Sequence, residues 1–166
     1  MTASGSMKMD SLQARPLDEL EVITNSLGLE FMRGGSRDVD FDGQLIRLGD
    51  AHSESQYEER LAHEIGHFLV APKSRRWKEN YGHESYSLSN KTKEREELAA
   101  AVLGMAIQLS VGSIINMYEK AYLWNYWDDA DSWHEFGFWI GADILLKRGW
   151  LVNGFKLNKQ KLEEFY

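Results

Sequence analysis

The chain has 166 residues, of which 43% are hydrophobic and 12% aromatic, and its formal net charge is −7. This length fits one domain with a core of its own, and the acidic balance disfavours direct binding to the phosphate backbone of nucleic acid. No apolar run approaches the roughly 20 residues that cross a bilayer. The absence of cysteine excludes disulfides and thiolate metal sites. These features favour a cytoplasmic protein without membrane contact and leave the oligomeric state open.

The start of the chain, MTASGSMKMDSLQAR, is polar and lacks the apolar centre of a secretion signal. We interpret residues 1–15 as a disordered leader or a cloning remnant. Residues 16–166 are then expected to form a single domain.

The first half of this domain predicts a helix followed by a hairpin. In PLDELEVITNSLGLEF, apolar residues recur at helical spacing, at Leu17, Leu20, Ile23 and Leu27. Gly28 ends that pattern. In DVDFDGQLIRLG, Asp42-Gly43 is a type I′ turn signal between two alternating segments, Val39 with Phe41 and Ile46 with Leu48. We expect a hairpin here, or the edge of a small sheet.

The next segment, HSESQYEERLAHEIGHFLV, predicts an amphipathic helix. Its apolar stripe consists of Tyr57, Leu61, Ile65 and Phe68. Ser55, followed three residues later by Glu58, is typical of a capping box at the helix start. Pro72 cannot continue the helix and marks its end.

The second half predicts further helices and no strand. A polar loop is expected at residues 73–91. The expected helices are a capped helix from Thr92 to about Gly112, helices within 113–127 and 128–149, and a short terminal helix within 158–166. Trp133 and Trp139 are interpreted as packing residues. The predicted class is therefore α+β, mostly helical, with the strands early in the chain.

The motif His63-Glu64-Ile65-Gly66-His67 carries the chemistry of this sequence. Residues four apart lie on one face of a helix, so His63 and His67 can hold one metal ion from a single rigid element. Glu64 is turned about 100° from His63 on the helix, where it can reach a water rather than the ion. Two neutral imidazoles with an open position are typical of catalytic zinc, beside which a glutamate acts as the base. Gly66 would let another backbone pack closely behind the site.

A third ligand must come from elsewhere in the chain. A downstream histidine of the Gly-x-x-His type is excluded because Val70 and Lys73 occupy the required positions. Glutamates at the start of the following helix remain. Glu97 shares a small apolar stripe and is preferred, Glu94 is nearly as good, and Glu96 ranks third.

Two residues of the loop after the motif, Tyr81 and His83, could contact the substrate or steady an oxyanion. Ordinary loop roles are the alternative for both side chains.

The run from the hairpin through LAHEIGH to EREELAAAVLG resembles the ImmA/IrrE group of small zinc metallopeptidases, over roughly residues 17–110. The resemblance implies a zincin-like fold with a short sheet packed on the motif helix. It also implies zinc bound by His63, His67 and a glutamate within 94–97, with Glu64 as the base. The implied substrate is a protein segment, such as a regulator, that enters as an extended strand along the hairpin edge.

A second stretch, HEIGHFLVAPKSRRWKENYG, resembles the metal-binding region of elongation factor P hydroxylases. The matching residues are the motif, the pair Arg75-Arg76, residues 80–82, and a downstream Glu94 with Glu97. This resemblance implies Fe²⁺ and oxygen-dependent hydroxylation of a protein. Two histidines and a carboxylate serve both zinc and non-haem iron, so the ligands do not separate the two reactions. A non-catalytic metal-binding interaction domain is the third alternative.

Overall fold

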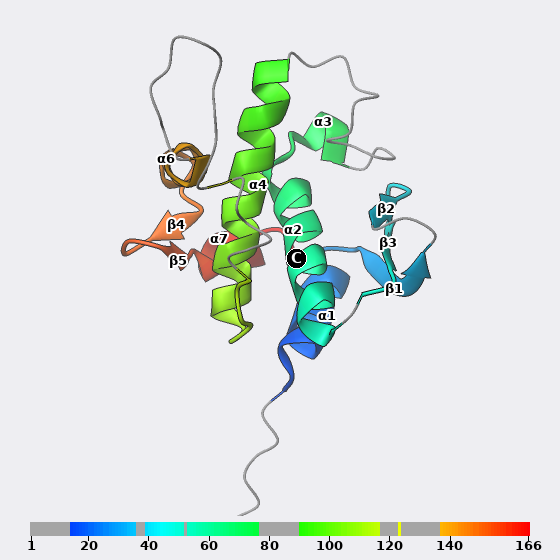
Figure 1. The fold of residues 1–166 in the computed structure, drawn as a ribbon. Coiled ribbons are helices and arrows are strands. Elements are labelled where there is room, and N and C mark those ends of the chain that lie inside the picture. The colour runs from blue at the N-terminus through cyan, green and yellow to red at the C-terminus, as the bar shows by residue number, and fades with distance from the viewer. Residues whose placement is uncertain (1–13, 36–38, 52, 77–89, 117–122, 124–136) are drawn as a thin grey trace, which may run out of the picture.

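The computed structural model describes residues 14–35, 39–51, 53–76, 90–116, 123 and 137–166. Its helices are α1 (Pro16–Ser26), α2 (Glu54–Val70), α3 (Lys73–Arg76), α4 (Asn90–Ser110), α6 (Gly137–Lys147) and α7 (Lys159–Glu163). Its strands are β1 (Glu30–Gly35), β2 (Val39–Phe41), β3 (Leu45–Gly49), β4 (Leu151–Val152) and β5 (Lys156–Leu157). The predicted α+β class, mostly helical with an early sheet, is confirmed (Figure 1). None of the described helices is long and apolar enough to cross a membrane.

Helices α2 and α4 lie side by side at the centre of the molecule, in backbone contact (Figure 1). A Cβ atom added at Gly66 would lie 2.3 Å from the carbonyl oxygen of Ala100. A Cβ added at Gly104 would lie 3.1 Å from the carbonyl oxygen of Ala62. Each helix therefore contributes a glycine where the other passes, as expected for Gly66 from the sequence. The buried residues around this contact belong to one hydrophobic core.

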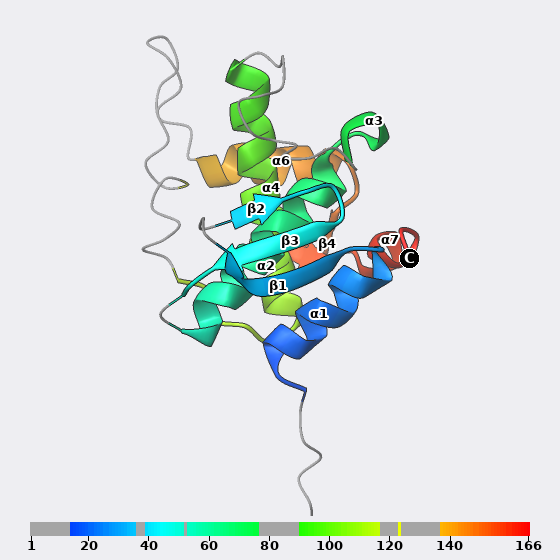
Figure 2. The same ribbon diagram turned by 90° about the vertical axis from the view of Figure 1, so that its right-hand side faces the viewer.

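The three-stranded sheet has the order β1-β3-β2, with β3 parallel to β1 and antiparallel to β2. Figure 2 shows the sheet in front of α2, with α1 alongside β1. The side chains of Phe41, Ile46 and Leu48 are buried in the core. The predicted hairpin is thus present as β2–β3. Strand β1 was not predicted, because its exposed residues Met32 and Arg33 and its two glycines give no apolar alternation.

The turn between β2 and β3 differs from the predicted type I′ turn. Asp42 N–H donates to the Leu45 carbonyl, which places Gly43 and Gln44 at the centre of the turn. Gly43 has φ +101°, whereas Gln44 is not in the left-handed region, as in type II′ turns. The Asp42 carboxylate accepts hydrogen bonds from the backbone N–H groups of Gln44 and Leu45, at 3.1 and 2.8 Å. The aspartate therefore stabilises the turn from its first position.

The predicted capping box at Ser55 and Glu58 is wrong. The N-cap of α2 is Ser53, and Ser55 lies inside the first turn, with the two hydroxyl oxygens 3.0 Å apart. Glu58 is buried, and burial, followed by the charge of Glu54, raises its pKa. The helix therefore starts two residues earlier than the capping signal indicated.

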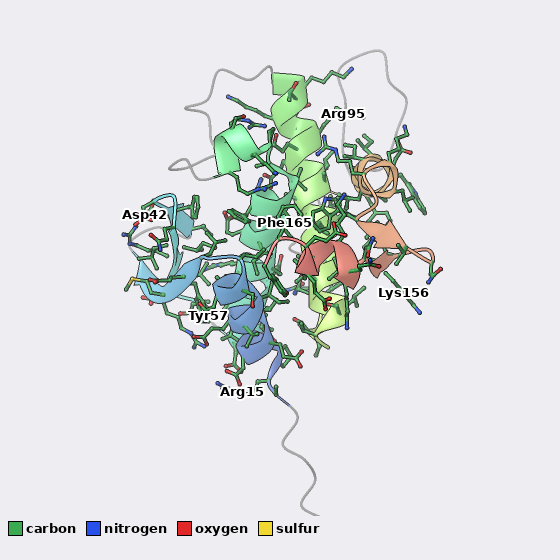
Figure 3. The ribbon with its side chains drawn as sticks, turned by 180° about the vertical axis from the view of Figure 1, so that it is seen from behind. Arg15, Asp42, Tyr57, Arg95, Lys156 and Phe165 are labelled. Carbon is green, nitrogen blue, oxygen red and sulfur yellow. The ribbon has the colours of Figure 1, made fainter. Side chains whose placement is uncertain are left out.

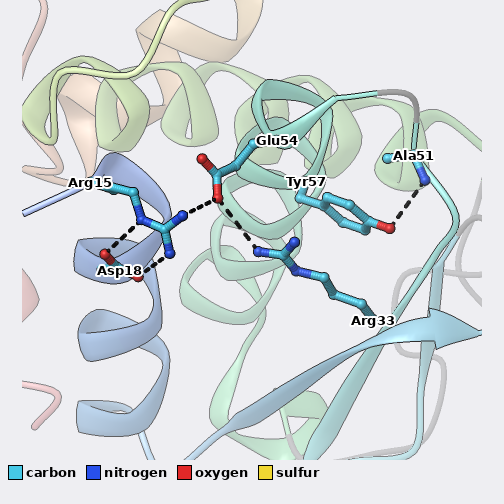
Figure 4. Close-up of polar contacts among 6 residues, drawn as sticks. All are labelled: Arg15, Asp18, Arg33, Ala51, Glu54 and Tyr57. Carbon is cyan, nitrogen blue, oxygen red and sulfur yellow. Dashed lines mark hydrogen bonds and ion pairs between the residues drawn. The ribbon is translucent and has the colours of Figure 1, made fainter.

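Polar contacts join the start of α2 to α1 and β1 (Figure 4). Glu54 lies 3.0 Å from an Arg15 nitrogen and 3.7 Å from an Arg33 nitrogen. The Arg33 guanidinium lies over the ring of Tyr57. Of the leader predicted for residues 1–15, the first 13 lie outside the described part of the chain, but Arg15 is placed and contacts α2.

The C-terminal elements cover a second face of α4. A Cβ added at Gly141 would lie 2.5 Å from the Leu98 carbonyl oxygen, so α6 also packs against the α4 backbone. In Figure 3, Asp42 on the three-stranded sheet and Lys156 on the β4–β5 hairpin lie on opposite sides of the helices. The hairpin was not predicted, since its strands have only two residues each.

Several predictions for the second half of the chain are corrected. Short helix α3 lies in the predicted loop, and α4 begins at Asn90 rather than Thr92. Residues 113–116 are not helical, and the rest of the helix predicted within 113–127 lies almost entirely outside the described residues. Trp139 is 63% exposed, so its predicted packing role is wrong. Trp133 lies outside the described residues, and the predicted terminal helix is confirmed as α7.

Candidate metal centre

Three side chains from α2 and α4 converge at the helix contact. His63 Nε2 lies 2.9 Å from Glu97 Oε1, and His67 Nε2 lies 2.8 Å from Glu97 Oε2. The two Nε2 atoms are 3.1 Å apart. One donor atom from each residue lies within 4.8 Å of the others, so the three residues could hold a metal ion.

The donor set suits zinc in both spacing and chemistry. Ligand atoms bound to a tetrahedral zinc at about 2.0–2.1 Å lie about 3.3 Å from one another. The observed separations of 2.8–3.1 Å therefore need to widen by only a few tenths of an ångström. If both imidazoles donate Nε2–H to Glu97, the two N–H groups also face each other, which is unfavourable. A cation at this point would instead accept a lone pair from all three residues.

The cluster is buried on the α2 side and open on the α4 side. The side chain of His67 is 9% exposed and that of His63 is 18% exposed, whereas that of Glu97 is 44% exposed. A bound ion would therefore have protein on one side and solvent access on the other. Among the described residues only three candidate ligands converge, which would leave a fourth coordination position without a protein ligand, as in catalytic rather than structural zinc sites.

The metal-free cluster binds a proton strongly. Burial alone would lower the pKa of His67, but the charge and hydrogen bond of Glu97 outweigh it and raise that pKa to about 9. Burial alone would raise the pKa of Glu97, but the charges of His63 and His67 hold it well below its usual range. At neutral pH a protonated His67 therefore forms an ion pair with the Glu97 carboxylate.

Residues 18–110 match the family model of the M78 peptidases, described as the IrrE N-terminal-like domain. The chain belongs to this IrrE N-terminal-like family. The resemblance to the ImmA/IrrE group is thereby confirmed, and the matched region contains all three residues of the metal cluster. Comparison with curated proteins and with solved structures gave no significant match.

In this IrrE-like protein the three candidate glutamates have different surroundings. Glu97 is the one brought to the histidines. Glu96 forms an ion pair with Arg75, at 2.7 Å. Glu94 is exposed and does not belong to the cluster. The preferred third ligand from the sequence is therefore the glutamate that the fold places beside His63 and His67.

The other predicted site residues are not part of the three-residue cluster. Glu64 follows His63 on α2, is half-buried, and its charge contributes to the raised pKa of His67. Tyr81 and His83 lie outside the described residues. The structure therefore does not address an oxyanion role for these two side chains.

The pair Arg75-Arg76 has a structural role that sequence reasoning missed. Arg75 contacts α4 through Glu96, and Arg76 donates hydrogen bonds to the carbonyl oxygens of Phe68 and Ala71 at the end of α2. Cationic side chains just beyond a helix C-terminus commonly bind its last carbonyls, and this signal could have identified Arg76.

Zinc affinity in this IrrE-like protein is expected to rise with pH. Because the pKa of His67 is raised, protonation of this side chain contributes stability to the fold. That contribution is fully present below pH 6.5 and is lost as the pH rises through about 9. Zinc must displace that proton, so affinity should increase by about tenfold per pH unit between neutrality and the folded pKa. Chelator-competition titrations from pH 6.5 to 9 would measure this slope, and a pH-independent affinity would contradict it.

Proposed function

We propose that this protein is a zinc-dependent metallopeptidase that hydrolyses a peptide bond in a protein substrate. The supporting observation is the convergence of His63, His67 and Glu97 from two helices, in a chain of a peptidase family. Their two imidazoles and one carboxylate are a ligand set of catalytic zinc. The open side beside Glu97 gives a substrate access to this cluster.

In the proposed mechanism, His63, His67 and Glu97 hold the ion. Zinc, when bound, lowers the pKa of water and polarises a carbonyl group. Glu64 takes a proton from the attacking water as its oxygen bonds to the substrate carbonyl carbon. The same carboxyl group then gives that proton to the departing amine as the C–N bond breaks. Glu64 is thus the general base and afterwards the general acid.

The substrate is proposed to be an extended protein segment. Among the described residues, strand β2 is an edge of the three-stranded sheet, and an extended segment can add to such an edge through backbone hydrogen bonds. A segment pairing there would gain affinity without a fixed sequence. We further infer that residues 16–166 form one domain and that it acts in the cytoplasm, with neither nucleic acid nor membrane as a direct partner.

Iron-dependent protein hydroxylation is the alternative that uses the same ligands. Its sequence support included the pair Arg75-Arg76. Both arginines have structural partners near the cluster, so they no longer favour hydroxylation over hydrolysis. Metal identity separates the two reactions.

Metal content of the purified protein, measured by mass spectrometry, tests the proposal. We expect close to one zinc per chain and its loss in a folded His63→Ala variant, because two remaining ligands rarely retain a catalytic ion. Iron with oxygen-dependent turnover would establish the hydroxylase instead. Failure to bind either metal after reconstitution would overturn both.

A further inference from the structure

We propose that α3 acts as a clamp that positions the metal ligands, with Arg75 holding α4 and Arg76 holding α2. This inference rests on the proposed metal site. Each arginine binds beside a ligand: Arg75 contacts Glu96, the neighbour of Glu97, and Arg76 contacts the carbonyl of Phe68, the neighbour of His67. Neither arginine belongs to the cluster itself.

The contact between Arg75 and Glu96 is a two-pronged ion pair in a poorly solvated position. Arg75 Nη2 lies 2.7 Å from Glu96 Oε2, and Arg75 Nη1 lies 3.4 Å from Glu96 Oε1. The two side chains are 14% and 10% exposed. Paired guanidinium–carboxylate hydrogen bonds fix relative orientation as well as distance. This pair therefore fixes the first turns of α4 relative to α3.

Arg76 holds the other ligand-bearing helix by its C-terminal end. Its Nε and Nη2 atoms donate to the carbonyl oxygens of Phe68 and Ala71, at 2.8 and 2.9 Å. The final carbonyls of a helix have no partner within the helix. The guanidinium also lies over the rings of Phe68 and Phe165, 5.4 and 4.7 Å from their centroids. Arg76 is therefore held in place while it fixes the last turn of α2.

The clamp acts at one end of the contact between α2 and α4. The two backbones meet at Gly66 with Ala100 and again at Gly104 with Ala62. His67 follows Gly66 on α2, and Glu97 precedes Ala100 on α4. Because these two helices run antiparallel, both ligands lie beyond the contact at the end where α3 follows α2. A small rotation of one helix about the contact would separate their donor atoms. Holding both helix ends through one short helix prevents that rotation.

Glu96→Gln tests the clamp, because it removes the ion pair but leaves all three ligands. We expect zinc affinity to fall by about 10- to 100-fold, as for other groups that orient metal ligands. The visible spectrum of the cobalt-substituted protein should also change, since it reports ligand geometry. Asp143→Asn is the matched control, because it breaks the exposed ion pair with Lys147 on α6. The control should keep the wild-type affinity and spectrum.

Arg75→Lys provides a second test should Glu96→Gln fail to fold. Lysine keeps the positive charge opposite Glu96 but cannot form two parallel hydrogen bonds, so we expect a smaller loss of affinity and a shifted cobalt spectrum. A folded variant of either kind with wild-type zinc affinity and an unchanged spectrum would overturn the clamp. Failure of the metal site would look different, because the wild-type chain would then bind neither zinc nor cobalt. Failure of the peptidase function alone would appear as zinc binding without peptide cleavage, and the effect of Glu96→Gln on zinc affinity would remain measurable.

Discussion

Glu64→Gln is expected to abolish peptide hydrolysis while leaving zinc content at the wild-type level. Glutamine keeps the shape of the side chain but cannot accept a proton from water, and loss of a general base typically lowers rates by about 10²- to 10⁴-fold. Glu64 is not one of the three convergent residues, so metal binding should survive. Mass spectrometry of a broad peptide mixture, incubated with zinc-loaded protein, would measure the products.

Two comparisons make this result specific. Glu94→Gln changes another glutamate, exposed and outside the cluster, and should leave the rate unchanged. His63→Ala should lose activity together with zinc, unlike Glu64→Gln. If Glu64→Gln cleaves peptides at more than about a tenth of the wild-type rate, then Glu64 is not the base.

Gly66→Ala should destabilise the whole protein, although alanine favours helix by about 1 kcal/mol over glycine. The new methyl group would lie 2.3 Å from the Ala100 carbonyl oxygen, a separation that no side-chain rotation relieves. The helices must move apart, and overpacking of this kind costs about 1–3 kcal/mol or more. We expect a lower free energy of unfolding in urea and weaker zinc binding, because His67 and Glu97 sit beside this contact.

Two further alanine variants serve as controls for the loss of stability in Gly66→Ala. At Gly104 the nearest contact of an added methyl is 3.1 Å, so Gly104→Ala should cost less than Gly66→Ala. Ser55→Ala, at an exposed position of α2, should change stability by less than about 0.5 kcal/mol. Equal stability of all three variants would mean that α2 and α4 do not touch through their backbones.

The sequence predicted most reliably those features that are local along the chain. Four-residue spacing placed His63 and His67 on one face of α2, and Gly66 indicated a close backbone approach. Helical phase ranked Glu97 first but kept Glu94 close behind. Helical phase gives the angle between the two glutamates on their own helix. Which of them reaches the histidines depends on the side from which α2 packs against α4.

Features that depend on distant residues were not predictable from local pattern. Strand β1 forms through parallel pairing with β3, and its own residues show no alternation. Arg75 and Arg76 lie in a polar stretch that reads as a loop, and their partners are on α4 and α2. Trp139 was expected to pack in the core because aromatic residues at helical spacing usually do so, but the face that α6 buries against α4 contains Gly141 instead.

The packing of α6 on α4 bears on whether the family region of this chain could fold by itself. Residues 18–110 match the family model and include every residue of the cluster. Yet the buried side of α4 around Leu98 and Val102 is covered by α6 at Gly141. The boundary of the shared family region is therefore not a boundary of the hydrophobic core. In this chain α6 shares a hydrophobic core with the two helices that carry the cluster, so residues 18–110 on their own would expose the apolar side of α4 that α6 covers.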